Sequence, residues 1–164
     1  FTGIKGLLNF LSIFIFAFIL SCKSVQNYAQ ELSRKLIEEN KPDITFRSAK
    51  IKEATLNDIT LECILDIKNN LPEEMPIEKI EIELINTDGK IFSTANSVES
   101  LRIPANATRT KTVILNAKYF EVFSTAISSI QNRNLKCTAK TYITLTMARM
   151  KFRFPYTVEI VFVE

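Results

Sequence analysis

The chain has 164 residues, 46% of them hydrophobic, which is enough for one domain with its own core. Its 21 basic and 18 acidic residues leave a net charge of +3, which does not favour a nucleic-acid-binding protein. Histidine is absent and only three glycines occur, so an imidazole base or metal ligand and a glycine-rich phosphate loop are excluded. We therefore expect no enzyme, no metal, no cofactor and no small-molecule substrate.

Residues 1–21 are predicted to be a signal peptide. The apolar run Leu7 to Leu20 is shorter than the ~20 residues that span a bilayer and typical of the hydrophobic region of an export signal. It ends in Ile19-Leu20-Ser21-Cys22, which resembles the lipobox of bacterial lipoproteins. The resemblance implies cleavage before Cys22 and acylation of that cysteine by diacylglycerol and a further chain such as palmitate. An uncleaved anchor helix is the alternative.

Residues 22–41 are predicted to be the lipidated cysteine followed by a helical spacer. One apolar stripe follows the helical period, with Ser24 as a cap and Asn40-Lys41-Pro42 as the stop. The stripe comprises Val25, Ala29, Leu32 and Leu36. As an alternative, the same stripe could dock a partner protein.

From residue 42 to residue 164 the apolar residues recur with a period of two, which predicts strands. Asp88-Gly89 predicts a two-residue hairpin in which both positions have positive φ. The segment Lys118–Asn132 returns to the helical period, so a helix is expected before the last two strands. The expected strands are Ile44–Glu53, Ile59–Asn69, a segment around Ile80–Leu84, one after Lys90, Thr108–Asn116, Leu135–Thr146 and Met150–Val163.

Short antiparallel strands with one apolar face each bury that face by packing against one another. We therefore expect a mainly β protein, a two-sheet antiparallel β-sandwich of the immunoglobulin or fibronectin-III kind. The helix at Lys118–Asn132 would cover one end or open edge of that sandwich.

The order of motifs over residues 42–164 resembles the LEA14-like family (late embryogenesis abundant type 2, or WHy domain). Asn69-Asn70-Leu71-Pro72 resembles the family's Asn-Pro-Asn, with the proline displaced. Met75-Pro76-Ile77 and Ile103-Pro104-Ala105-Asn106 resemble its proline turns, and Phe154-Pro155 lies in its last strand.

The resemblance implies a seven-stranded sandwich with one helix, no catalytic activity, and a role in stress protection or in binding macromolecules or membranes. Combined with the lipobox, it predicts an exported lipoprotein anchored in membrane lipid through Cys22, in the bacterial cell envelope on the periplasmic side or at the outer membrane. The alternative is an accessory or assembly subunit that binds another envelope protein.

Two sets of residues are candidate sites. Cys63 and Cys137 lie at apolar positions of expected strands, so they are either a disulfide worth ~4 kcal/mol or two buried free thiols. Arg149, Lys151 and Arg153 alternate with apolar residues, so they are either an anionic-surface site or a solvated strand face. Arg109 and Lys111 form a lesser basic stripe, and Glu81 and Glu83 are expected to be solubility charges.

Overall fold

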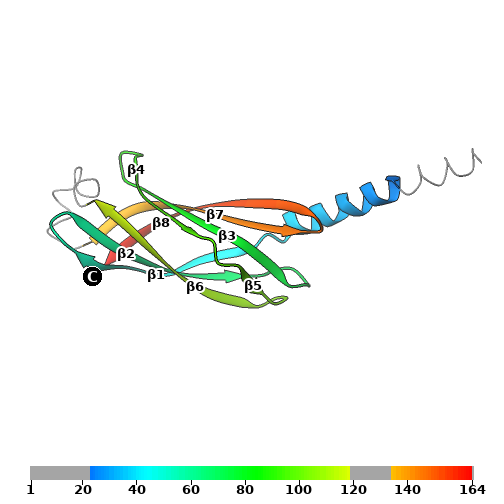
Figure 1. Ribbon diagram of the computed structural model, residues 1–164, viewed down its shortest axis with the longest axis horizontal. Helices are drawn as coiled ribbons and strands as arrows, with labels where there is room; N and C mark the ends of the chain where they lie inside the picture. Colours follow the sequence, from blue (N-terminus) through cyan, green and yellow to red (C-terminus); the bar gives the residue numbers. More distant parts are fainter. Residues whose placement is uncertain (1–22, 119–133, 164) are drawn as a thin grey trace, which may run out of the picture. The chain divides into compact units, whose positions relative to one another are not determined.

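The computed structural model describes residues 23–118 and 134–163 (Figure 1). The chain divides into two units, residues 1–39 and 40–164. The described part of the first unit is a helix over residues 23–39, which ends before Pro42 as the sequence predicts. Within the described residues, no helix is both long and apolar enough to cross a membrane. Cys22 and most of the helix expected at Lys118–Asn132 lie outside the described residues.

The second unit is built from β-strands. Their bounds agree closely with the strands expected from the period of two, with two exceptions: β3 starts at Met75, five residues before the expected Ile80, and the short strand β5 was not expected. They are β1 (Asp43–Ala54), β2 (Asp58–Lys68), β3 (Met75–Ile85), β4 (Ile91–Ser97), β5 (Leu101–Ile103), β6 (Thr108–Lys118), β7 (Asn134–Met147) and β8 (Met150–Val163).

The strands form the predicted sandwich. They follow the order β4-β3-β7-β8-β1-β2-β6, with β5 paired to β3 (Figure 1). Every pairing is antiparallel except that of β1 with β8, which is parallel and consists of the single pair Lys50 and Val163. This weak seam divides the strands into a half of β4, β3, β7 and β8 and a half of β1, β2 and β6.

The parallel direction of β1 and β8 determines which loops share an end of the domain. The chain enters at Pro42 just before β1, and β8 starts at the β7–β8 hairpin, so both lie at one end. Asp43 at the start of β1 pairs with Lys68 at the end of β2, and Lys68 pairs with Thr108 at the start of β6. The end of β2 and the start of β6 therefore lie at this end of the domain as well. We call this the entry end.

The core follows from strict alternation along the strands. On β2, alternate side chains are almost wholly buried while their neighbours are half-buried, because one face packs on the opposite half. The buried set on β2 is Ile59, Leu61, Cys63, Leu65 and Ile67. The Thr141 hydroxyl is also buried, and it has no hydrogen-bond partner among the described residues.

The Asp88-Gly89 prediction is correct for the place of a hairpin and wrong for its type. Within this loop, only Gly89 has positive φ, at 80°. Asn86 accepts a hydrogen bond from Gly89 N through its carbonyl and from Asp88 N and Lys90 N through its side chain. The loop is therefore the three residues 87–89, a turn followed by a left-handed glycine.

A two-residue turn does occur, in the β7–β8 hairpin. Ala148 and Arg149 have φ of 50° and 62°, and the paired residues Met147 and Met150 flank them. Two consecutive positive φ values are the signature of a type I′ turn, whose twist matches that of the strands. Neither residue is a glycine or an asparagine, so the sequence gives no warning of this turn.

The buried side chain of Asn69 holds the entry end together. It is 0% exposed, and its amide nitrogen donates to the carbonyls of Glu73, Ile103 and Pro104 at 2.7, 3.0 and 3.1 Å. Its Oδ1 accepts a hydrogen bond from Leu71 N at 2.8 Å. One amide thus satisfies four backbone groups from two loops, so it ties the β2–β3 loop to the end of β5.

Substituting Asn69 by alanine should lower the free energy of unfolding by about 3 kcal/mol, because Leu71 N–H and several carbonyls lose their buried partner. Chemical denaturation of both proteins measures the difference. Asn57→Ala is the matched control, since Asn57 is exposed in the β1–β2 turn and should cost at most about 0.5 kcal/mol. Equal losses from the two substitutions would contradict this role of Asn69.

Candidate functional site

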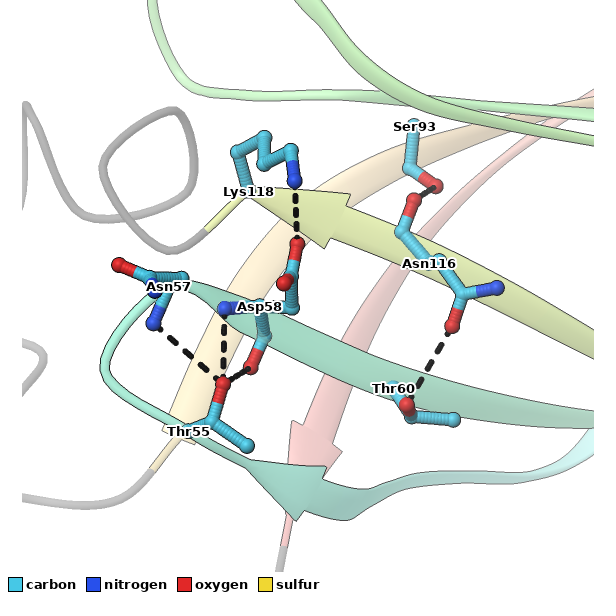
Figure 2. A network of polar contacts seen from close by, with 7 residues as sticks. All are labelled: Thr55, Asn57, Asp58, Thr60, Ser93, Asn116 and Lys118. Carbon is cyan, nitrogen blue, oxygen red and sulfur yellow. Dashed lines mark hydrogen bonds and ion pairs between the residues drawn. The ribbon is translucent and has the colours of Figure 1, made fainter.

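The open edge between β4 and β6 is closed by side chains. Ser93 Oγ donates to the carbonyl oxygen of Asn116 at 2.7 Å, and the Asn116 amide accepts from Thr60 at 3.3 Å (Figure 2). Lys111 pairs with Glu99 of the β4–β5 loop. The two halves of the sandwich therefore meet at this edge as well as at the β1–β8 seam.

The end opposite the entry end is ordered by a short polar network. Thr55 Oγ1 accepts from Asp58 N at 3.0 Å and from Asn57 N at 3.3 Å, and it donates to Asp58 O (Figure 2). The Asp58 carboxylate is 2.7 Å from Lys118 Nζ at the end of β6. These contacts fix the β1–β2 turn, and they hold no group poised for chemistry.

The predicted row of cations is placed unevenly. The alternation holds, with Phe152 and Phe154 buried and Lys151 and Arg153 exposed. Arg149 lies in the hairpin turn and not in the strand. Among the described residues, neither Arg149 nor Lys151 forms an ion pair, whereas Arg153 does. The three cations therefore differ: Arg149 and Lys151 at the hairpin tip have no ion pair among the described residues, whereas Arg153 pairs with Glu81.

Arg153 belongs to a cluster on the outer face of the larger half. Its guanidinium carbon lies 3.6 Å from the centroid of the Tyr142 ring, and its Nε is 3.3 Å from Glu81 Oε2. Lys79 Nζ approaches the other Glu81 oxygen at 2.8 Å. The hydrogen bond from Lys79, followed by that from Arg153, holds the pKa of Glu81 below its usual range. Glu81 is therefore an ion-pair partner and not a free solubility charge.

The lesser basic stripe differs from its expected placement. Arg109 and Lys111 pair in register with Ile67 and Leu65, whose side chains point into the core. The two cations therefore project toward the interior side at the entry end, where the sandwich opens. Lys111 is only 20% exposed and pairs with Glu99, and Arg109 stays exposed.

The entry end is fixed by Tyr156 of β8. Its hydroxyl donates to the carbonyl oxygen of Pro42, and Lys41 Nζ lies 5.8 Å from its ring centroid. Burial, and then the charge of Asp43, raise the pKa of Tyr156 above its usual range, so it remains a donor. Asn70 donates to the carbonyl of Lys41 as well. These contacts hold the point where the chain enters the domain against β8 and the β2–β3 loop.

Cys63 and Cys137 are both buried, and both are free thiols in the structure. Burial raises the pKa of each to about 12, with Glu62 adding to the effect at Cys63 and Cys63 adding to it at Cys137. Because the thiolate is the reactive form, neither thiol is suited to act as a nucleophile. The candidate disulfide is not formed here.

Two hollows occur on the surface of the described domain. One hollow, of about 540 Å³, is bordered by the β3–β4 hairpin, the start of β7 and the end of β8. Gly89, Lys136 and Glu159 are among the residues that line it. One of about 440 Å³ follows the β1–β8 seam, beside Phe46 and Val161. In the parts of the chain that the structure describes, no group of three or more His, Cys, Asp or Glu side chains could hold a metal ion.

Sequence reasoning missed the residues that organise these contacts. Tyr142 and Tyr156 give no local signal, because their partners Arg153 and Pro42 come from other strands or loops. Asn69 was indicated only by the family resemblance.

Solved structures share the fold, and two of them are no more than 11% identical to this chain. A protein from Archaeoglobus fulgidus has a TM-score of 0.53 at 10% identity, over 74% of this chain and 95% of its own. AT1g01470 from Arabidopsis thaliana has a TM-score of 0.58 at 11% identity, over 73% of this chain and 82% of its own. At2g46140.1, described as a late embryogenesis abundant protein, matches at 16% identity over 85% and 88% of the two chains, with a TM-score of 0.39.

No family model and no curated protein matches the sequence. The likeness to the first two of these structures shows a shared fold.

Glu81 should make the stability of the domain depend on pH. Its pKa is lowered in the folded state, so its contribution is present above its unfolded pKa of about 4.3 and is lost as the pH falls through the folded value. Between pH 7 and pH 3 the wild type should therefore lose more stability than Glu81→Gln, as thermal unfolding measures. Glu83→Gln is the control, because Glu83 is on the same face of β3 and has no ion pair among the described residues; it should follow the wild type.

Proposed function

We propose that this protein is an exported lipoprotein, held at the bacterial cell envelope by acyl chains on Cys22, whose sandwich is a non-catalytic binding or stress-protective module of the LEA14 kind. The lipobox supports the anchor, and the distant likeness in fold supports the module. The perturbed groups of the described domain are consistent with this view, since Glu81 is in ion pairs and both thiols are buried.

The observation that supports the proposal is that the point where the chain enters the domain and the basic hairpin share one end of the domain. The chain arrives at Pro42, which Tyr156 fixes in place. From the level of Tyr156, β8 runs back six residues to Met150, so the hairpin extends roughly 20 Å beyond the entry point. A domain tethered through its N-terminus thus presents this hairpin toward the surface that holds the tether.

The charges of the entry end suit an anionic surface. Its exposed cations without an ion pair among the described residues are Lys41, Lys68, Arg109, Arg149 and Lys151. Of the carboxylates nearby, Glu74 pairs with Arg102, Glu99 pairs with Lys111, Asp43 accepts a hydrogen bond from Asn70, and Glu73 is exposed. Each basic residue near a charged bilayer contributes about 1 kcal/mol of attraction. We therefore expect the module to lie against anionic headgroups while its far end stays free to contact clients.

The anchor is tested by the intact mass of the protein extracted from bacterial membranes with detergent. A mass equal to residues 22–164 plus two or three acyl chains is expected. Cys22→Ser should lose the acyl mass and leave the membrane fraction. An unprocessed mass for the wild type would instead indicate an anchor helix.

The surface contact is tested with vesicles containing 30% anionic lipid, using the Cys22→Ser protein so that acyl chains do not contribute. The double variant Arg149→Ser, Lys151→Ser should bind roughly 30-fold more weakly, which corresponds to about 2 kcal/mol. Lys50→Ser, Lys90→Ser is the matched control, because these exposed cations lie at the opposite end. Equal binding by the two double variants would reject the hairpin contact and favour the alternative role, docking to another envelope protein.

A further inference from the structure

We propose that Cys63 and Cys137 are the site of an intramolecular disulfide that joins the two halves of the sandwich when the chain is oxidised before its core closes. The inference is independent of the lipid anchor and rests on where the strand order and register place the two residues.

The strand order sets the two cysteines opposite each other. Counting from the β1–β8 seam, β2 is the second strand of one half and β7 is the second strand of the other. The halves also meet at the far edge, where Ser93 bonds to Asn116, so they face each other across one core. Strands that are equally far from the seam lie across from one another in such a sandwich, as β2 and β7 do.

The register places the cysteines at nearly the same level. The seam pairs Lys50 with Val163, and Val163 pairs with Asn134 on β7. Cys63 pairs with Ala49, one residue from that level toward the entry end. Cys137 is three residues from Asn134 in the same direction. The two positions therefore differ by about two residues along the strands.

Both side chains point into the same core. Cys63 is 0% exposed and Cys137 is 3% exposed, and each alternates with residues that face outward, so both sulfurs lie in the core between the halves. Cys63 also contributes to raising the pKa of Cys137, which happens only between groups that lie close together. An inter-sheet disulfide across a sandwich core is an established arrangement in other domains of this architecture.

The chemistry needs an oxidant, which we assign as a dithiol-disulfide exchange partner. One cysteine thiolate attacks the partner's disulfide and releases one of its thiols, and the second cysteine thiolate then displaces the other. Two S–H bonds are lost from this chain, one S–S bond forms, and the partner takes up the two electrons and two protons as two thiols.

Because both thiols are buried in the folded domain, we expect the disulfide to form before folding is complete. A pKa of about 12 leaves almost no thiolate at neutral pH, and both cysteines are buried in the folded domain. The disulfide must therefore form while the chain is still open, and a domain that has folded as a dithiol should stay a dithiol.

The test uses the full chain carrying Cys22→Ser, so that only two thiols remain. It is refolded from denaturant either in a mixture of oxidised and reduced glutathione or in reductant alone. The oxidised sample should lose two hydrogens in intact mass, give a peptide that links Cys63 to Cys137, and melt roughly 10 °C higher, because the bond closes a loop of roughly 70 residues. The same glutathione mixture added to protein already folded in reductant should leave the mass unchanged.

Two variants control the experiment. Cys137→Ala and Cys63→Ala should each refold identically with or without oxidised glutathione, and having both guards against a variant that fails to fold. If the Cys22→Ser protein refolded with oxidised glutathione keeps two free thiols, or forms disulfides only between separate chains, the proposal is overturned. A linked monomer that melts below the reduced form would also overturn it, since the bond would then strain the sandwich.

Discussion

The entry end of this domain depends on one buried amide, that of Asn69. Two loops must cross the open end of the core, and their backbone carbonyls and N–H groups would otherwise be buried without partners. The side chain of Asn69 bonds to four of those groups at once. The backbone N–H of Asn69 also donates to the carbonyl of Ala107. Its neighbour Asn70 then fixes the start of β1. The route from β2 to β3, the pairing of β5 and the entry of the chain all depend on this pair of residues.

The strands could be predicted from the sequence because each has one buried face. The period of two located β2 and β8 within a residue or so of their observed ends. β5 has only three residues, too few for a period, and it exists because Asn69 and β3 hold it in place. The turn types could not be predicted, since the pairing of Met147 with Met150 imposes the φ values of Ala148 and Arg149.

The contacts of the candidate site were less accessible to prediction. Alternation correctly separated the cations of β8 from its phenylalanines, but the partners of Arg153 come from β3 and β7. For Arg109 and Lys111 the face itself was predicted wrongly. Charged residues were expected on the outer face, but the register places these two on the same side as the buried Ile67 and Leu65. A charge pattern along one strand predicts a face; which charges remain unpaired depends on strands far away in the sequence.

The parallel seam has a mechanical consequence. A pull at Pro42 that is directed along β1 and away from the domain loads β1 from its first residue. The hydrogen bonds between β1 and β2 lie across the direction of the load, so they resist it together and do not open one after another. Tyr156 and Asn70 hold the loaded point to β8 and to the β2–β3 loop. The β1–β2 ladder and the contacts of Tyr156 and Asn70 therefore favour resistance to tension applied along β1 at Pro42.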